Sequence, residues 1–153
     1  HAGPDRMTRF MLTVHVLAAT VWAGGHLVLS LSVLPKALRA GNPQIVHDYE
    51  SAYERVGLPA LLIQVITGIW LAWRLIPDIG AWFTFGSPIA TTIGVKLILL
   101  AVTLALAVHA RLRLVPRLEE GALKPLAFHI VAITIVAVLM VVAGVGFRTG
   151  GVF

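Results

Sequence analysis

Residues 10–35, FMLTVHVLAATVWAGGHLVLSLSVLP, contain no Asp, Glu, Lys or Arg. A helix that crosses the hydrocarbon core of a bilayer needs about 20 mostly apolar residues, so this stretch is long enough to span it. A buried helix of a soluble bundle would keep a polar face, and this stretch has almost none. It therefore predicts a transmembrane helix.

Similar stretches recur along the chain, and we expect spans over about 10–35, 56–76, 89–112 and 125–147. Between the first two, Asn42 suits a helix cap and Pro43 the first helical turn, which predicts a short surface helix over 43–54. The expected fold is therefore all-α. It is an integral membrane four-helix bundle, connected up-down-up-down, with residues 1–153 forming a single transmembrane domain.

The composition excludes several classes of protein. Of 153 residues, 58% are hydrophobic and 12% are charged, against roughly 25% charged in an ordinary soluble domain. The chain has no Cys, so disulfides, Fe–S clusters, thiolate metal sites and c-type haem attachment are excluded. The net charge of +5 comes from basic residues that punctuate apolar segments instead of forming a basic face. We therefore expect a lipid bilayer as partner and no nucleic acid.

The basic residues also predict an orientation. The loops between spans one and two and between spans three and four hold Lys36, Arg39, Arg55, Arg111, Arg113, Arg117 and Lys124. The opposite side holds Arg6, Arg9, Arg74 and Arg148. Because cytoplasmic loops are enriched in Lys and Arg, we expect both termini on the periplasmic side of a bacterial inner membrane.

Ionisable groups inside spans are candidates for function, because they are costly at membrane depth. In the first span, His15, Trp22 and His26 lie along one helical face, and small residues such as Gly25 lie beside it. Two histidines on one such stripe favour a bound metal or cofactor. The alternative is close helix packing, with each imidazole bonded to a backbone carbonyl.

Depth sorts the candidates into two tiers. We expect an outer tier of His15, Lys96 and Met140, and an inner tier of His26, His109 and His129 near Arg111 and Arg113. Lys96 is expected to face the bundle and to contact a cofactor or His15, unless it snorkels to the surface. Lys96 and His109 point in different directions on the third span, so they do not share a narrow site.

The inner tier favours haem b. Such a haem needs axial histidines on facing helices and a cation near each propionate. We expect His26 to be opposed by His129, ahead of His109, with small residues beside His26 letting the macrocycle lie flat. Copper remains the alternative, since His and Met suit it. Met140 is then a candidate ligand, but Met7 and Met11 lie at the outer mouth and form no path with it.

Three stretches resemble the copper resistance protein D (CopD) family of integral membrane proteins. They are VHVLAATVWAGGHLVLSLSVLP at 14–35, LLIQVITGIWLAWRL at 61–75 and GVKLILLAVTLALAVHARLRLVPRL at 94–118. The matching residues are His15, Trp22, Gly24, Gly25, Pro35, Thr67, Gly68, Trp70, Lys96, Arg111, Pro116 and Arg117. The resemblance implies a role in copper uptake or tolerance. The chain differs from the family pattern at His26 and His109.

A weaker similarity is to HemJ, the four-helix, haem-associated protoporphyrinogen oxidase family, and it rests on His15, Trp22 and Lys96. Three functional hypotheses follow. The first is a histidine-ligated haem b protein that passes electrons between a quinol or periplasmic carrier and an unidentified acceptor, which would make it an oxidoreductase; a homo-oligomer is compatible with this hypothesis. The second is a copper-binding or copper-transporting protein, and the third is a HemJ-like porphyrinogen oxidase.

Overall fold

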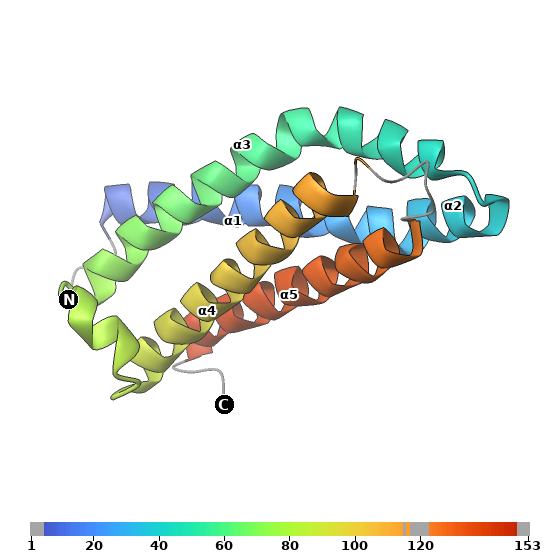
Figure 1. The fold of residues 1–153 in the computed structure, drawn as a ribbon. Coiled ribbons are helices and arrows are strands. Elements are labelled where there is room, and N and C mark those ends of the chain that lie inside the picture. Colours follow the sequence, from blue (N-terminus) through green and yellow to red (C-terminus); the bar gives the residue numbers. More distant parts are fainter. Residues whose placement is uncertain (1–4, 115, 117–122, 150–153) are drawn as a thin grey trace.

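The computed structural model describes residues 5–114, 116 and 123–149. These residues form helices and connecting turns, without a β-strand among them (Figure 1). The helices are α1 (Arg6–Val28), α2 (Leu34–Ala40), α3 (Pro43–Leu75), α4 (Pro88–His109) and α5 (Leu123–Thr149). The described residues also contain three short helical segments. Two are π-helical, η1 (Leu29–Val33) and η3 (Ala110–Leu114), and one is a 3-10 turn, η2 (Ile79–Phe83).

The four predicted spans are confirmed. The helical segments Arg6–Ala40, Pro43–Leu75, Pro88–Arg113 and Leu123–Val145 are long and apolar enough to cross a membrane. α1 begins, and α5 ends, at the same end of the bundle (Figure 1). We name this the outer end and the opposite end, near α2 and η3, the inner end, after the predicted orientation. Arg117, counted in that orientation, lies outside the described residues.

The predicted surface helix over 43–54 is not a separate element. Asn42 caps the helix as expected, since its side chain accepts from the Gln44 amide at 3.0 Å. The helix then runs unbroken through Leu75 and includes Pro59. No turn-forming residue separates Glu54 from Val56, so the chain has no reason to leave the helix there. At 33 residues, α3 is about 50 Å long, longer than the hydrocarbon core of about 30 Å.

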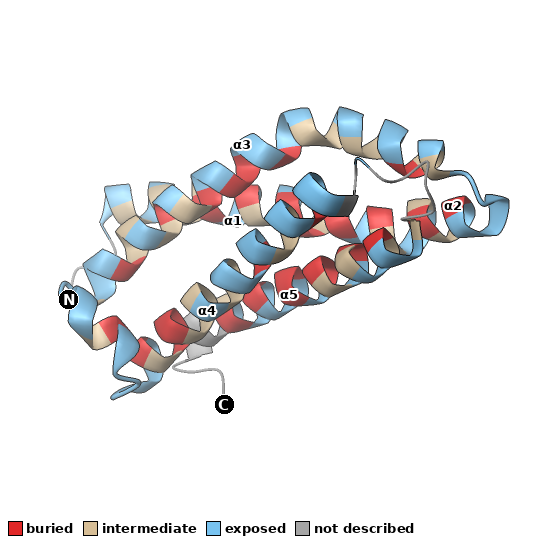
Figure 2. Cartoon of the chain, in the orientation of Figure 1, coloured by how far each residue is buried: buried red, intermediate tan, exposed pale blue. Residues whose placement is uncertain are grey.

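The helices pack as two antiparallel pairs. α1 makes its most extensive contacts with α3, and α4 with α5, while contacts between α1 and α5 join the pairs. α3 and α4 make few contacts in the described part of the chain. Figure 2 shows buried residues turned toward the bundle interior and exposed ones outward.

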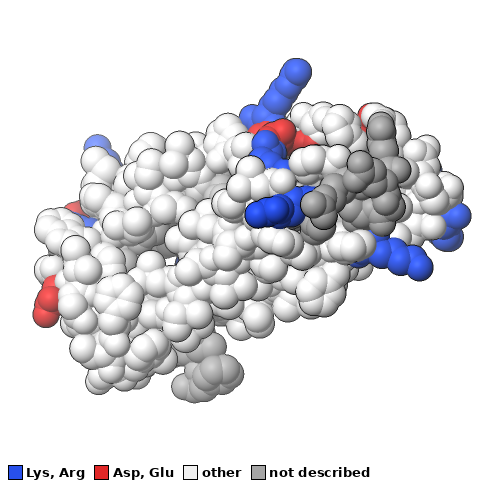
Figure 3. All heavy atoms as spheres, in the orientation of Figure 1, with Lys and Arg blue, Asp and Glu red and all other residues white. Residues whose placement is uncertain are grey.

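The outer surface of the bundle is apolar. Side chains such as Leu31 and Phe128 are 76% and 71% exposed. Figure 3 shows a broad uncharged band over α4 and α5, with charged atoms gathered on either side of it. A soluble protein rarely exposes so much contiguous apolar surface, so lipid is the solvent that fits this band.

Candidate functional site

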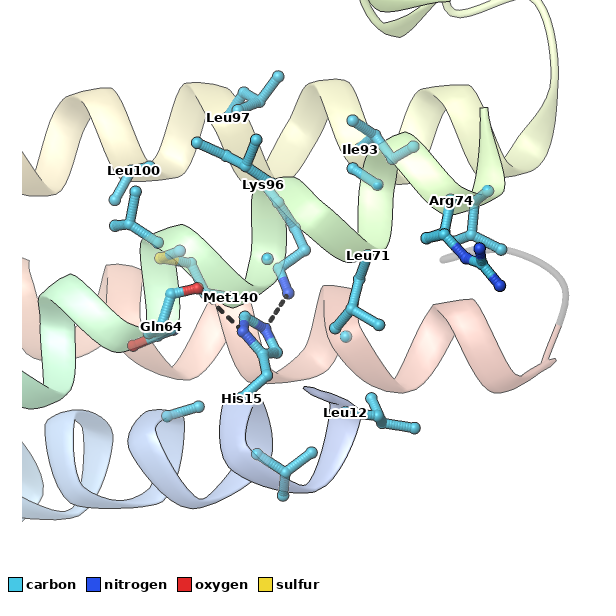
Figure 4. Close-up of a pocket in the computed structure, with 18 of the residues that line it drawn as sticks. Leu12, His15, Gln64, Leu71, Arg74, Ile93, Lys96, Leu97, Leu100 and Met140 are labelled. Atoms are coloured by element: carbon cyan, nitrogen blue, oxygen red, sulfur yellow. Dashed lines mark hydrogen bonds between the residues drawn. The ribbon is translucent and has the colours of Figure 1, made fainter. Parts of the chain in front are cut away.

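A cavity of about 900 Å³ lies inside the outer half of the bundle. We call it the outer cavity. Most of its lining is apolar, and each long helix adds at least one side chain with a hydrogen-bonding or metal-binding atom. These side chains include His15 from α1, Gln64 from α3, Lys96 from α4 and Met140 from α5 (Figure 4). The structure therefore brings together the three residues predicted for the outer tier and adds Gln64.

The His15 imidazole is held in one orientation by α3. Its Nδ1 lies 2.9 Å from the Gln64 backbone oxygen and 2.9 Å from Thr67 Oγ1. A carbonyl oxygen only accepts, so we assign the ring proton to Nδ1. The lone pair of a neutral imidazole is then on Nε2. Histidines that bind metals are commonly oriented in this way, by donating their other ring nitrogen to a carbonyl.

Lys96 meets His15 at that second nitrogen. Its Nζ lies 3.4 Å from His15 Nε2 (Figure 4). The prediction that Lys96 faces the bundle at the level of His15 is confirmed. With the assigned tautomer, the ammonium donates and Nε2 accepts, so the only lone pair of the ring is shared with a cation.

Two glycines make room for this pair. A Cβ added at Gly68 would lie 3.0 Å from His15 Cε1, and one at Gly144 would lie 3.7 Å from Lys96 Nζ. The first distance is tighter than ordinary contact, so the backbone of α3 approaches His15 closely because residue 68 has no side chain. The Thr67-Gly68 pair thus supplies both a polar contact and the space for the imidazole.

Gln64 carries an unsatisfied acceptor. Its side chain is 6% exposed, and its Oε1 is buried without a hydrogen-bond partner among the described residues. Buried polar atoms are nearly always paired, so an unpaired one beside a cavity calls for an explanation. At the outer rim, Asp5 and Arg74 form an ion pair. Hydrogen bonds from Thr8 hold the pKa of the Asp5 carboxyl below its usual range.

A packed apolar layer follows the outer cavity along the bundle. Its buried members are Trp22, Ala23, Leu61, Ile133 and Ala137. Each lies on its helix next to cavity-lining residues, on the inner side. The layer separates the outer cavity from His26.

The expected flat cofactor site beside His26 is absent from the described residues. Gly25 is covered by the Tyr53 ring, and a Cβ added there would overlap that ring. The His26 ring lies 4.4 Å from Trp22 and 5.6 Å from Tyr53, centroid to centroid. Its Nδ1 donates to the Trp22 carbonyl at 2.9 Å. Trp22, Gly25 and His26 thus pack against protein, as the close-packing alternative predicted.

His129 meets His109 instead of the expected His26. His109 Nδ1 lies 2.8 Å from His129 Nε2, and the two rings are stacked at 4.8 Å. α4 and α5 pack side by side. His109 points in a different direction from Lys96 on α4, and this direction is toward α5. Of the cations expected near a propionate, Arg111 pairs with Glu54, and Arg113 is exposed on η3.

Thr67 and Gly68 were named from the sequence only for their resemblance to the CopD pattern, and none of Gln64, Thr67, Gly68 and Tyr53 was predicted to lie in a site. Gln64, Thr67 and Gly68 are three and four positions apart on one helix, which places them on the same face. That polar spacing was a usable signal for the residues that orient His15. Tyr53 gave no comparable signal, because its contact with Gly25 depends on how α3 crosses α1.

These features define a class: a membrane-spanning four-helix protein with a mostly apolar cavity in the outer half of the bundle, into which a few polar side chains project. The family model described as copper resistance protein D matches residues 49–147. The chain therefore belongs to the CopD family, and it is a copper-resistance-related membrane protein. Comparisons with curated proteins and with solved structures gave no match. Gln64, Lys96 and Met140 lie within the matched residues, and His15 precedes them.

Proposed function

We propose that this protein binds copper as cargo in the outer cavity, through His15 Nε2 and Met140 Sδ, and passes it on across the membrane. One observation carries the proposal: an imidazole fixed by a backbone carbonyl and a thioether from another helix line the same cavity in a CopD family member. Met140 is 7% exposed, so its sulfur belongs to the interior.

The donor atoms fit reduced copper. A thioether selects Cu(I), and an imidazole suits copper in either oxidation state. The described residues contain no group of three or more His, Cys, Asp or Glu that could hold a metal ion. A site with only a few donor atoms binds a metal ion weakly, and an ion in transit must be able to leave its site. The outer cavity therefore suits a passing ion better than a stored one.

Lys96 controls this site in the proposal. Its ammonium and a copper ion compete for the lone pair of His15 Nε2, and two cations at such short range repel each other strongly in the bilayer interior. Copper binding therefore moves the ammonium away. The buried Gln64 Oε1, which accepts no hydrogen bond from a described residue, offers the ammonium an acceptor on α3, in the lining of the same cavity.

The test is Cu(I) binding to the purified, detergent-solubilised chain, measured against a competing chelator. We expect His15→Ala and Met140→Leu to weaken binding at least tenfold. The matched controls, His47→Ala and Met7→Leu, change exposed residues that do not line the outer cavity and should bind like the unmodified chain. Wild-type affinity in both cavity variants would refute the proposal.

One observation favours haem b as a second candidate in the same place. Cofactor pockets enclose about 300–1,000 Å³, and the outer cavity has about 900 Å³ with His15 as an axial donor. In this alternative the protein exchanges electrons with a quinol or a periplasmic carrier. A Soret band in the purified protein that disappears in His15→Ala would favour haem. A colourless protein that binds copper would favour the first proposal.

We also propose that the outer cavity faces the periplasm of a bacterial inner membrane, as the positive-inside rule predicts. Copper then enters from the periplasmic side. The packed layer around Trp22 and Ile133 stands between the cavity and the inner end, so onward passage requires this layer to open.

A further inference from the structure

Two histidines face each other near the inner end of the bundle, away from the outer cavity. His109 is the last residue of α4, and His129 lies on α5, close to its start. Their facing nitrogens, His109 Nδ1 and His129 Nε2, lie 2.8 Å apart, and the ring planes differ by 18°. His109 is exposed and His129 is half-buried, so the pair can be reached from outside the bundle.

The hydrogen bonds of His129 match those of a metal ligand. Its Nδ1 lies 3.0 Å from the Pro125 carbonyl oxygen and therefore carries the ring proton. Its lone pair is on Nε2 and points toward His109. A ligating imidazole usually donates its other nitrogen to a carbonyl in this way, which fixes both the tautomer and the ring orientation. In the structure described here, His109 Nδ1 donates to that lone pair.

We propose that His109 Nδ1 and His129 Nε2 form a second copper site, in which Cu(II) binds both nitrogens and replaces the hydrogen bond between them. A metal with metal–nitrogen bonds of about 2.0 Å spans donors roughly 2.8 Å apart when they subtend a right angle. The observed nitrogen separation is 2.8 Å. Tetragonal Cu(II) has right angles between neighbouring ligands, and imidazole is among its preferred donors.

Binding requires one tautomer change and a rotation of both rings, because in a right-angle site each lone pair points at the metal and not at the other nitrogen. The proton on His109 Nδ1 moves to Nε2 by exchange with water at the inner end of the span, which ends close by at Arg113, and no proton is lost overall. The metal then sits between two neutral donors. Nearby Arg111 is paired with Glu54, so its charge is partly compensated. Water completes the coordination, and open positions allow the ion to be handed to an acceptor.

This inference rests on the proposed function only for the role of copper as cargo, since the geometry of the pair is independent of the outer cavity. The site binds Cu(II) supplied at the inner end, and its occupation requires no conversion of the Cu(I) of the outer cavity into Cu(II). Both histidines occur where α4 and α5 pack against each other, so the site also requires the native contact between these helices.

Cu(II) added to the purified full chain tests the site, with electron paramagnetic resonance as the readout. We expect a tetragonal signal with hyperfine splitting from coordinated nitrogen. His109→Ala and His129→Ala should each weaken Cu(II) binding at least tenfold, while His47→Ala should leave it unchanged. His15→Ala should also retain this signal, although it loses Cu(I) binding in the outer cavity. The two proposals can therefore fail separately.

A His→Ala variant that fails to fold would not show whether the pair binds Cu(II), so a second test uses the unmodified chain. Cu(II) should raise the melting temperature of the unmodified chain and of His47→Ala, and should not raise that of His109→Ala. Wild-type Cu(II) affinity in His109→Ala, or a spectrum of the unmodified chain without nitrogen coupling, would overturn the proposal.

Discussion

Lys96 of α4 donates to the same nitrogen of His15 that a metal would use. Nζ and Nε2 lie 3.4 Å apart inside the outer cavity, while the other ring nitrogen is engaged by α3. The two residues are 81 positions apart in the chain, so their contact exists only in the folded bundle. Whether a metal can reach His15 Nε2 therefore depends on where the Lys96 ammonium lies.

Replacing Lys96 with leucine should tighten Cu(I) binding. Two unit charges about 4 Å apart repel by about 4 kcal/mol at an effective dielectric constant of about 20. In the unmodified chain the lysine can move away from the copper ion, which relieves part of this repulsion. We therefore expect Lys96→Leu to raise the affinity about tenfold, or by about 1.4 kcal/mol. Chelator competition measures the change. Lys36→Leu is the matched control, because Lys36 is exposed near the inner end. Equal binding in Lys96→Leu would mean that the ammonium does not compete with copper, and weaker binding would mean that it assists the site.

Adding a methyl group at Gly68 should disturb the site more than the fold. The new Cβ would lie 3.0 Å from His15 Cε1 and would push the ring away from Thr67. Alanine also favours a helix over glycine, so we expect little loss of stability and about fivefold weaker copper binding. Gly144→Ala borders the same cavity with its Cβ at 3.7 Å from Lys96 Nζ, and it should bind normally. Unchanged binding in Gly68→Ala would show that His15 tolerates the displacement.

The sequence was sufficient to predict the four spans and the common depth of His15 and Lys96 in the bundle. Apolar length defines a span because a bilayer has a fixed thickness. The depth of His15 and Lys96, together with the need of a buried ammonium for a partner, predicted that Lys96 faces the bundle at the level of His15 and contacts either a cofactor or His15. Both arguments use distances along a helix, which the sequence determines through the rise per residue.

Contacts that depend on helix crossing were not predictable in the same way. Tyr53 covers Gly25 because one face of α3 turns toward α1, and His109 meets His129 because α4 packs on α5. Helical spacing assigns a residue to a face but does not say which neighbour that face meets. For the same reason, small residues near His26 were interpreted as space for a macrocycle, whereas the structure fills that space with a tyrosine ring.

Substituting Gly25 and Gly24 in turn separates close packing from helix propensity. A Cβ at Gly25 would overlap the Tyr53 ring, while one at Gly24 would meet nothing within 4 Å. Overpacking costs about 1–3 kcal/mol, and alanine is better than glycine in a helix by about 0.5–1 kcal/mol. We therefore expect Gly25→Ala to lower the melting temperature and Gly24→Ala to keep or raise it.

A second substitution identifies the cause of that loss. Tyr53→Leu removes the ring, so the combination of Gly25→Ala with Tyr53→Leu should be more stable than the sum of the single effects predicts. Additive losses would show that the ring is not what limits residue 25.

Labelling of introduced cysteines should place the outer cavity on the periplasmic side. The chain has no Cys, so each introduced thiol is the only one to react. Thr84, after η2, and Asp48, on α3, are both exposed and lie at opposite ends of the bundle. The excess of Lys and Arg at the inner end predicts that this end is cytoplasmic. In intact cells, a membrane-impermeant thiol reagent should label Thr84→Cys and should label Asp48→Cys only after permeabilisation. The reverse pattern would place the cavity on the cytoplasmic side, so that copper bound at His15 would come from inside the cell.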